Sequence, residues 1–557
     1  MSSGWLRRAA PIVPIAVLCA LPLVGLWQAA GPPMEEGFML VFPERVLDGD
    51  VPNRDFLHLY GPGSLWVLAA VYWLLGTTLA VQRAVGYLQH LGVAFGAFAL
   101  LRPWGPLVAS TGGAVAALVV LTPSGLSALA WIGGVALALW ALHAGVEALD
   151  APPGSRAWRR HLWTAGLLGG AALLYRLDLV VAVAGSMTVV WWWLDRSGRS
   201  RLLVSFAVGL SPYLIHLALA GPGDVVRGMV IEPVFELRGG RKLPLPPSWD
   251  DFDGFLQRAG TLDEPPWPLP APRGPVQLNL WLAAILVSTI LLLVAGARCA
   301  RAGRPRLLAM ALLASGILPQ ALQRADSTHL AWVSCVTFAF LPAALVELAP
   351  ARWRRVPWRA TIPAAAVPAL ILLVAIPHFP LRYYGEAVAQ TFGHRRNAAS
   401  MERGDRIFRY ARADAVEAVN ALIPLVDDLT EPGDRLFVGP GDLSKTPYSE
   451  AFLYYLLPEL EPATRYIEMD PGVANAEDSG LADELRSSDV VILSSIRDDW
   501  NEPNDSRLTG SQEPNQVLAA EFCLVASFGD GLFGRGLYEV YRPRADLGPC
   551  GPVSRVG

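Results

Sequence analysis

The chain has 557 residues, of which 53% are hydrophobic and only 17% are charged, and its mean hydropathy is +0.36. This composition is too apolar for a water-soluble protein, and repeated runs of about 20 apolar residues are typical of a membrane protein with several spans. The formal net charge of −4 and the lack of a basic block exclude a general nucleic-acid binder.

The first hydrophobic run follows Arg7 and Arg8, which is also the pattern of a signal peptide. It lacks a small-x-small cleavage site before the acidic stretch that follows, so we interpret it as an uncleaved span. With the later runs it makes about eleven predicted spans. Their ranges are 10–30, 81–101, 105–122, 125–149, 162–177, 179–194, 202–220, 277–297, 307–322, 330–349 and 360–378.

The loop predicted at 31–63 is unusually acidic for a connection between spans, and it includes Glu35, Glu36 and Asp55. It also carries His58 and Tyr60. Carboxylates close to a bilayer are costly and usually face a protein cavity, so they indicate a functional site. The alternative is a solvated loop whose charges only keep it in water.

Residues 64–80 are apolar enough to be a further span or a helix that lies along the membrane surface. If they do not cross, the Arg clusters of the connecting loops all fall on the cytoplasmic side. These clusters lie at 156–160, 196–201, 298–306 and 352–359. Because Arg in short loops sets the orientation of a membrane protein, we predict a surface helix, with its Trp and Tyr residues at the interface.

With 64–80 as a surface helix, the sequence predicts a cytoplasmic N-terminus and an outer location for 31–80, 221–276 and 379–557. The loop 221–276 contains the stretches LPLPPSW and DEPPWPLPAP. Prolines at this density exclude a regular helix or a central strand there.

Residues 379–557 are more polar than 1–378 and alternate helix-like with strand-like pieces, which predicts a separate α/β domain. The predicted strands are DRLFVG, RYIEMD, DVVILSS, CLVASFG and LYEVYRP, and the predicted helices are AVEAVNALIPLVDDL, 449–458 and 477–487. Neither a GxGxxG nor a P-loop spacing occurs in it. Cys523 and Cys550 both fall in this domain, where an oxidising exterior allows a disulfide; the alternative is two free thiols.

Two further polar groups are expected at the outer face. YRLD places Arg176 and Asp178 between the fifth and sixth spans, and RADSTHL places Arg324, Asp326 and His329 between the ninth and tenth. Arg binds phosphate through charge and forked donors. A carboxylate can deprotonate an acceptor hydroxyl. Together with the acidic loop, these residues predict an anion site beside a base.

The stretches PMEEGF, VLDGDVPNRDF and YGPG, followed by an amphipathic segment ending in LLG, resemble the first outer loop of the GT-C glycosyltransferases. These integral membrane enzymes use polyprenyl-phosphate sugars and include protein O-mannosyltransferases and lipid A aminoarabinose transferases. The resemblance covers mainly residues 1–220, RADSTHL resembles the donor-phosphate region of some members, and nothing comparable is found for 379–557. One departure is that Glu35 stands where the family has Asp, which leaves the assignment of a single base open.

The resemblance implies a polytopic helical GT-C-like fold, to which the α/β domain predicted above is added. The bias to Arg, Ala and Gly is typical of a GC-rich bacterial genome, so the expected location is a bacterial plasma (inner) membrane. The resemblance also implies transfer of a hexosyl or pentosyl group, with inversion, from a polyprenyl phosphate to a hydroxyl of a glycan, lipid or protein. The implied base is Glu35, with Glu36 and Asp55 orienting the acceptor or the sugar. The remaining roles are phosphate binding by Arg324, His329 and Arg176, positioning of these cations by Asp178 and Asp326, and support by His58 and Tyr60. Some members use a divalent cation, and Glu35 and Glu36 offer the oxygen ligands that Mg or Mn prefers.

Three other functions remain open from the sequence. A transporter or flippase of lipid-linked glycans would show matching broken spans in two halves. A glycan polymerase or ligase would depend on Arg in its outer loops. A non-catalytic cell-envelope assembly protein would leave the acidic pair far from Arg324.

Overall fold

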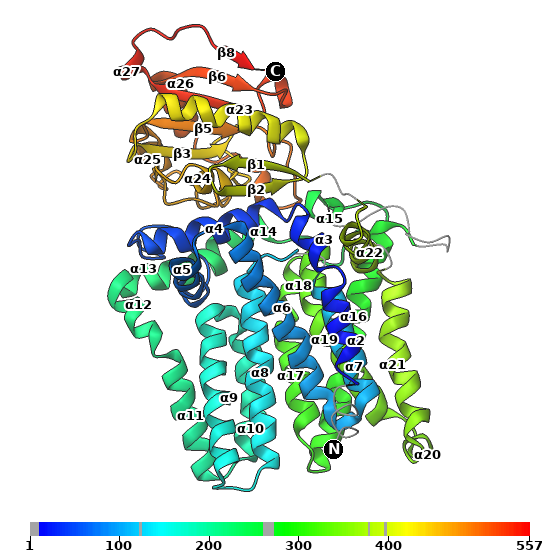
Figure 1. Cartoon of the computed structure of the whole chain (residues 1–557). Coiled ribbons are helices and arrows are strands. Elements are labelled where there is room, and N and C mark those ends of the chain that lie inside the picture. Colours follow the sequence, from blue (N-terminus) through cyan, green and yellow to red (C-terminus); the bar gives the residue numbers. More distant parts are fainter. Residues whose placement is uncertain (1–9, 122–124, 260–271, 377–378, 395–397, 557) are drawn as a thin grey trace.

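The structure is a computed structural model that describes residues 10–121, 125–259, 272–376, 379–394 and 398–556. A bundle of long helices carries a sheet domain on one end (Figure 1). Seven helices in the described ranges are long and apolar enough to cross a membrane. This confirms the predicted multi-pass helical fold with a C-terminal sheet domain. The number of spans and the division at residue 379 stay predictions, and Arg7 and Arg8 lie outside the described residues.

The helices of the bundle and of its connections follow one another closely along the chain. Those before the proline-rich loop are α2 (Val13–Ala20), α3 (Leu23–Gln28), α4 (Pro33–Leu47), α5 (Gly63–Leu75), α6 (Leu79–Leu101), η1 (Arg102–Trp104), α7 (Pro106–Val120), α8 (Ala130–Asp150), α9 (Arg156–Tyr175), η2 (Leu177–Leu179), α10 (Val180–Trp193), α11 (Arg196–Leu210) and α12 (Pro212–Ala220). Those from this loop onward are α13 (Pro222–Val226), η3 (Arg227–Glu236), α14 (Leu237–Arg241), α15 (Phe255–Ala259), α16 (Gly274–Arg301), α17 (Arg306–Ile317), α18 (Pro319–Gln323), α19 (Ser327–Leu348), α20 (Ala351–Arg354), α21 (Pro357–Val374) and α22 (Phe379–Thr391).

Helix α4 replaces the first part of the acidic loop that the sequence predicted. It bends by 83° away from the first hydrophobic segment, which is itself divided into α2 and α3. Pro33 stands in the first turn, where its missing N–H needs no partner, and Glu35 and Glu36 follow in the same turn. Carboxylates there are favoured by the positive end of the helix dipole, so the acids that suggested a loop also help to start a helix.

Helix α5 agrees with the predicted surface helix. Its 13 residues span about 20 Å, which is shorter than the roughly 30 Å hydrocarbon core of a bilayer. In Figure 1, α4 runs across the end of the bundle and α5 is seen along its axis, so neither is parallel to the long helices. Trp73, on the open side of α5, is 75% exposed.

The proline-rich loop is helical in its first part, so the prediction that it holds no regular helix is wrong. Residues 222–241 form α13, the π-helix η3 and α14 without a break. Pro222 occupies a first turn, and Pro233 lies in the π-helix, whose hydrogen-bond pattern differs from that of an α-helix. The stretch 243–249 contains no helix. Most of the second stretch, 263–272, lies outside the described residues.

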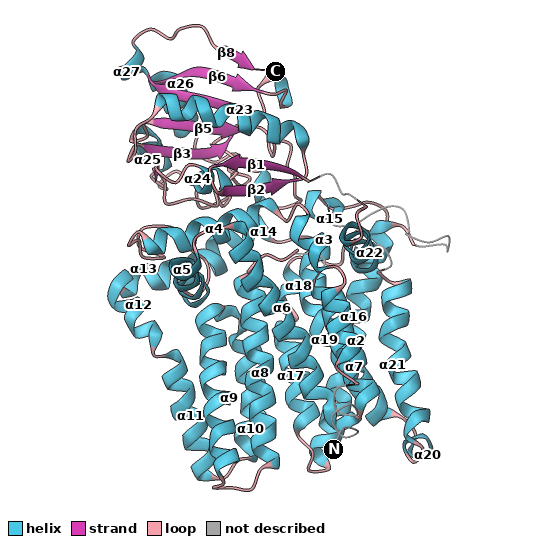
Figure 2. Cartoon of the chain, viewed as in Figure 1, coloured by secondary structure: helices cyan, strands magenta, loops and turns pink. Residues whose placement is uncertain are grey.

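The sheet domain contains a mixed six-stranded sheet of order β4-β3-β5-β7-β6-β8 and a separate hairpin, β1–β2 (Figure 2). Its strands are β1 (Ala399–Arg403), β2 (Arg406–Tyr410), β3 (Arg435–Pro440), β4 (Glu461–Pro462), β5 (Val490–Ser494), β6 (Phe522–Phe528), β7 (Tyr538–Pro543) and β8 (Ser554–Val556). Its helices are α23 (Ala413–Leu429), α24 (Phe452–Leu456), α25 (Leu481–Arg486), η4 (Asp505–Arg507), α26 (Glu513–Glu521), η5 (Leu532–Gly534) and α27 (Arg544–Leu547).

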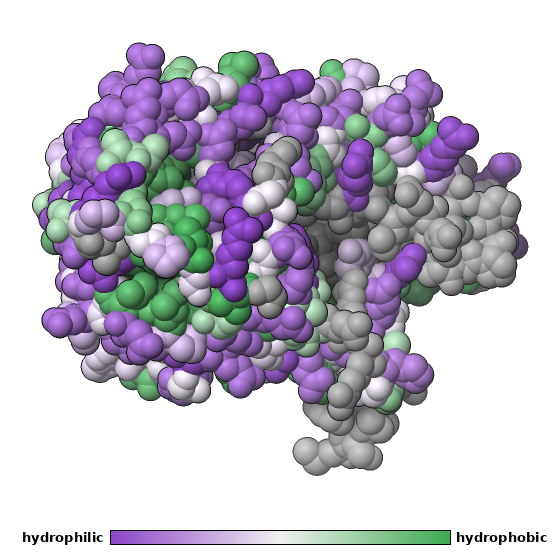
Figure 3. Space-filling view, turned by 90° about the horizontal axis from the view of Figure 1, so that it is seen from above, coloured by the Kyte–Doolittle hydropathy of each residue, from purple (hydrophilic) through white to green (hydrophobic). Residues whose placement is uncertain are grey.

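Four of the five predicted strands are present as β3, β5, β6 and β7, but RYIEMD is not a strand. Residues 465–470 form a buried loop beside the short strand β4. The prediction failed because buried loops and buried strands both carry apolar residues, so the sequence pattern does not separate them. Cys523 in β6 and Cys550 are joined by a disulfide. Seen from above, the domain surface is mostly hydrophilic, with scattered apolar patches (Figure 3).

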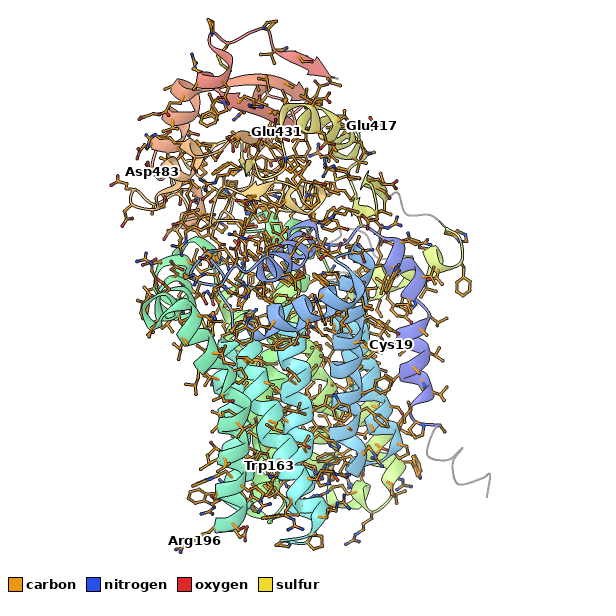
Figure 4. The ribbon with its side chains drawn as sticks, turned by 60° about the vertical axis from the view of Figure 1, so that its left-hand side comes forward. Cys19, Trp163, Arg196, Glu417, Glu431 and Asp483 are labelled. Atoms are coloured by element: carbon orange, nitrogen blue, oxygen red, sulfur yellow. A yellow bond between two sulfur atoms is a disulfide. The ribbon has the colours of Figure 1, made fainter. Side chains whose placement is uncertain are left out.

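Strands β3, β4 and β5 are parallel, so the loops that follow them leave the same edge of the sheet. This edge faces the bundle, because α24, which follows β3, packs on α4. Gly37 permits the contact: a Cβ there would lie 3.0 Å from the backbone nitrogen of Phe452. At the other end of the bundle lies Arg196, far from Glu417 and Asp483 of the sheet domain (Figure 4).

Candidate active site

A cavity of about 530 Å³ lies where the sheet domain meets the bundle. We call the side formed by α4, the α9–α10 junction and the α18–α19 connection its floor, and the side formed by α14 and the loops 441–451 and 463–480 its roof. Seven of the ten polar residues predicted from the sequence meet here. They are Glu35, Tyr60, Arg176, Asp178, Arg324, Asp326 and His329.

Glu35 projects from the first turn of α4 into the cavity. It is half-buried because the surface that it exposes faces the cavity, while protein surrounds it on the other sides. Burial raises the pKa of its carboxyl, and the nearby Arg497 and Arg324 oppose this shift. Within the described residues its side chain makes no hydrogen bond or ion pair with another residue. An unpaired carboxylate whose pKa is raised is a suitable proton acceptor.

Asp326 orders the loop that carries the second predicted cluster. Its carboxylate accepts hydrogen bonds from the backbone N–H of His329, at 2.9 Å, and from the ring nitrogen Nδ1, also at 2.9 Å. Burial raises its pKa, but His329 and Arg324 outweigh this effect and hold the pKa below its usual value. The Arg324 guanidinium lies 3.7 Å from Asp326 and, in the part of the chain that the structure describes, donates no hydrogen bond. Its forked donors therefore stay available to a ligand.

Arg176 is fixed by two neighbours. Asp178 accepts hydrogen bonds from its Nε at 2.9 Å and from its Nη2 at 2.5 Å, and the Tyr60 ring lies under the guanidinium at 3.9 Å. Gln320 donates a further hydrogen bond to Asp178 at 2.6 Å. Asp178 thus positions Arg176, as the sequence predicted, and Tyr60 supports it from below.

Glu36 does not enter this cavity, although it is the neighbour of Glu35. Its two carboxylate oxygens accept hydrogen bonds from Arg83, at 2.7 and 2.8 Å, and both side chains are fully buried. Successive residues of a helix point in different directions, so an adjacent pair of acids does not act on one substrate atom. The expectation that Glu36 orients the acceptor or the sugar beside Glu35 is therefore corrected: its carboxylate holds Arg83.

Asp55 and His58 also lie outside the cavity, which corrects their predicted placement. Asp55 pairs with the exposed Arg54 and accepts the backbone N–H of Val51 at 2.7 Å. The hydrogen bond from Arg54 is the main cause that lowers the pKa of the Asp55 carboxyl. His58 is buried beside the ring of Phe42, and burial lowers its pKa to about 3.

The residues do not fit a metal ion. Glu35 and Glu36 point to different places, and among the described residues no three His, Cys, Asp or Glu side chains form a group that could hold one. Hard cations need several converging oxygens, so no step is assigned to a cation.

Sequence reasoning missed the roof. Tyr448, Glu468 and Arg241 line it, and Glu468 and Arg241 form an ion pair at 3.4 Å. Charged residues are common throughout an outer domain, so composition does not single these out. The usable signal was GPGDLSKTPYSE, a turn-forming stretch directly after a predicted strand, because ligands bind beyond the carboxyl ends of parallel strands.

A second cavity, of about 660 Å³, lies beside the first, and Leu256 and Thr328 line both. Its walls include the Glu36–Arg83 pair and, from the sheet domain, Arg497 and Trp500.

No family model matches the chain, and no curated protein sequence matches it. Among solved structures, the chain is similar to ArnT from Cupriavidus metallidurans bound to undecaprenyl phosphate, with a TM-score of 0.54, 14% identity and coverage of 99% of this chain and 100% of that one. It is also similar to the apo state of the same protein, with a TM-score of 0.51, 15% identity and coverage of 99% of each chain. This likeness confirms the GT-C-type fold that the first outer loop suggested.

Proposed function

We propose that this protein is a glycosyltransferase that moves a sugar from a polyprenyl-phosphate donor to an acceptor hydroxyl at the outer face of a bacterial inner membrane. The observation that carries this proposal is that Glu35 and Arg324 face one cavity and that, within the described residues, neither side chain makes a hydrogen bond with another residue. The Glu35 carboxylate can act as a base, and the Arg324 guanidinium can bind a phosphate. The assembly-protein alternative expected them to be far apart.

The chemistry follows from this placement. Glu35 takes the proton of the acceptor hydroxyl, whose oxygen attacks the anomeric carbon while the bond to the polyprenyl phosphate oxygen breaks. Arg324 and His329 then stabilise the leaving phosphate, and Arg176 assists them. Attack from the side opposite the phosphate inverts the anomeric centre. The second cavity offers the acceptor a route to the same place.

The donor class is supported by the apolar wall of the cavity. Val180, Val230 and Val234 line it beside the charged floor, which suits a prenyl chain attached to a phosphate. The ArnT structure of similar fold is bound to undecaprenyl phosphate. Arg196, which begins one Arg-rich stretch, lies at the end of the bundle opposite the sheet domain (Figure 4), and α20, part of another, lies at the same end (Figure 1). This supports a cytoplasmic N-terminus and an outer sheet domain.

The test is transfer by the purified full-length protein in lipid nanodiscs. Polyprenyl phosphates that carry different radiolabelled sugars are incubated with a membrane extract as the source of acceptors. With the donor that reacts, Glu35→Gln should reduce turnover by about a hundredfold or more while donor binding is kept, because a general base contributes that much.

The matched control is Asp55→Asn, which neutralises a carboxylate of the same stretch outside the cavity and should leave turnover within about twofold of the parent. Normal turnover by Glu35→Gln would exclude this residue as the base. Failure of the parent to transfer any sugar or to bind undecaprenyl phosphate would contradict the proposed function itself.

A further inference from the structure

The roof brings side chains of the sheet domain to the same cavity as Glu35. Tyr448 comes from the loop after β3, and Glu468 from the loop after β4. The proposed reaction assigns nothing to either residue. Both loops leave the edge of the sheet at which parallel strands place their ligand sites. The sheet domain is thus part of the cavity wall.

The backbone of these loops is strained at and next to the residues that line the cavity. Among the described residues, four that are not glycine have positive φ: Asn53, Thr446, Tyr448 and Met469. Three of them belong to the roof loops. Tyr448 has φ +102°, and Met469, with φ +53°, directly follows Glu468. Side chains larger than Gly avoid this region, and such strain collects at functional sites, where it fixes a side chain in place.

The roof also offers hydrogen-bonding groups that the protein leaves unused. Glu468 is 8% exposed, and one of its oxygens lies 3.4 Å from Arg241, which also pairs with Asp470. In the part of the chain that the structure describes, the other Glu468 oxygen and the Tyr448 hydroxyl have no hydrogen-bond partner. Both groups line the cavity, where the hydroxyl of a ligand can supply the missing partner.

We propose that the roof is the subsite for the sugar ring of the donor, with Glu468 accepting and Tyr448 exchanging hydrogen bonds with its hydroxyl groups. This inference rests on the proposed function and makes the sheet domain a determinant of which sugar is transferred. A sugar hydroxyl both donates and accepts, so a carboxylate, a phenol and an arginine suit a pair of neighbouring hydroxyls.

A phosphate does not suit the roof. Glu468 would repel it, and Arg241 is already neutralised by Asp470 and Glu468. On the floor, the Arg324 guanidinium lies 3.7 Å from Asp326 and, within the described residues, donates no hydrogen bond, so its donors are available to a phosphate. The two sides of the cavity therefore divide the donor between them, with the phosphate on the floor and the sugar against the roof.

The experiment compares two probes on the full-length protein in nanodiscs: undecaprenyl phosphate alone, and undecaprenyl phosphate bearing glucose, mannose or arabinose. Glu468→Gln and Tyr448→Phe should each bind undecaprenyl phosphate as the parent does. Glu468→Gln should bind the sugar-bearing probe that the parent prefers about tenfold more weakly, since a hydrogen bond to a charged group is worth at least that factor. Tyr448→Phe should bind it about three- to tenfold more weakly, since a neutral hydrogen bond is worth less. Arg324→Ala should weaken both probes.

Matched controls come from the same domain. Glu461→Gln changes an exposed carboxylate, and Tyr466→Phe removes a hydroxyl that donates to the Ser479 carbonyl outside the cavity. Neither should discriminate between the probes. Melting temperatures of all variants show whether each is folded, and Tyr448→Phe, which removes one oxygen, keeps the test valid if Glu468→Gln unfolds.

Equal affinity of parent and both roof variants for every sugar-bearing probe would overturn the inference. So would an equal loss for both probes, which would place the phosphate at the roof. In either case Arg324-dependent binding of undecaprenyl phosphate and Glu35-dependent transfer would leave the proposed function standing.

Discussion

The floor of the cavity belongs to the helical bundle and the roof to the sheet domain and α14, and their polar side chains are held in different ways. On the floor, Glu35 lies in the first turn of α4 and Arg324 in the α18–α19 connection, and neither charged group donates or accepts a hydrogen bond with another described residue. On the roof, Glu468 is paired with Arg241, and Tyr448 is held by a strained backbone. If the proposed roles hold, the base and the main phosphate ligand keep hydrogen-bonding groups for the substrate, whereas the carboxylate that would recognise the sugar is paired.

The largest effect is expected where the floor is anchored. Arg83 also donates a hydrogen bond to the Trp27 carbonyl at 2.6 Å, so the Arg83–Glu36 pair ties the end of α3 to the start of α4. Arg83→Met leaves the buried Glu36 carboxylate without a partner. It should lower the free energy of unfolding by about 3–5 kcal/mol, measured by denaturant or thermal unfolding in detergent.

Arg54→Met is the control, because it breaks the exposed pair with Asp55, which should matter by less than about 1 kcal/mol. Equal losses for the two variants would show that the floor does not depend on a buried anchor.

The second largest effect compares an arginine of the floor with an arginine of the roof in the binding of undecaprenyl phosphate. Arg324→Ala should weaken the binding of undecaprenyl phosphate by about ten- to a hundredfold, because charge-assisted hydrogen bonds to the phosphate are lost. Arg324→Lys should recover only part of this loss, because an ammonium lacks the fork. Arg238→Ala, at the exposed edge of the roof, should change the affinity by less than about threefold. A larger effect of Arg238 than of Arg324, measured by titration, would reverse the assignment of floor and roof.

The smallest effect concerns the contact between the proline-rich loop and the sheet domain. Glu502 accepts the backbone N–H of Leu256 at 2.7 Å, and burial raises its pKa to about 7. A carboxyl whose pKa is raised by folding disfavours the folded state once it ionises. This contribution is therefore absent at low pH and grows as the pH rises from about 4.5 to above 7.

Glu502→Gln cannot ionise, so its melting temperature should exceed that of the parent by more at pH 8 than at pH 5. Glu461→Gln, on the exposed strand β4, should follow the parent at both values. Parallel pH profiles for Glu502→Gln and the parent would mean that this carboxyl titrates normally.

Much of the floor could be predicted because its signals are local. Apolar runs of span length mark the bundle, and Arg176, Asp178, Arg324 and Asp326 stand out because the short loops predicted at the outer face hold few other charges. The predictions failed where neighbours in sequence diverge in space. Glu36 was expected to act beside Glu35, but successive helix residues point about 100° apart, and Glu36 points to Arg83 instead.

By itself, the sequence determined that the chain is a helical membrane protein with a C-terminal α/β domain, and it predicted that several unusual polar residues gather at one face. The length of an apolar run and the energetic cost of a charge near lipid depend on residues that are adjacent in the sequence, so both can be predicted from the sequence. Only the tertiary structure decided which carboxylate faces the cavity and that the sheet domain covers it. Those outcomes depend on contacts between distant segments, such as Arg406 with Glu44, 362 residues apart, and Phe452 against Gly37.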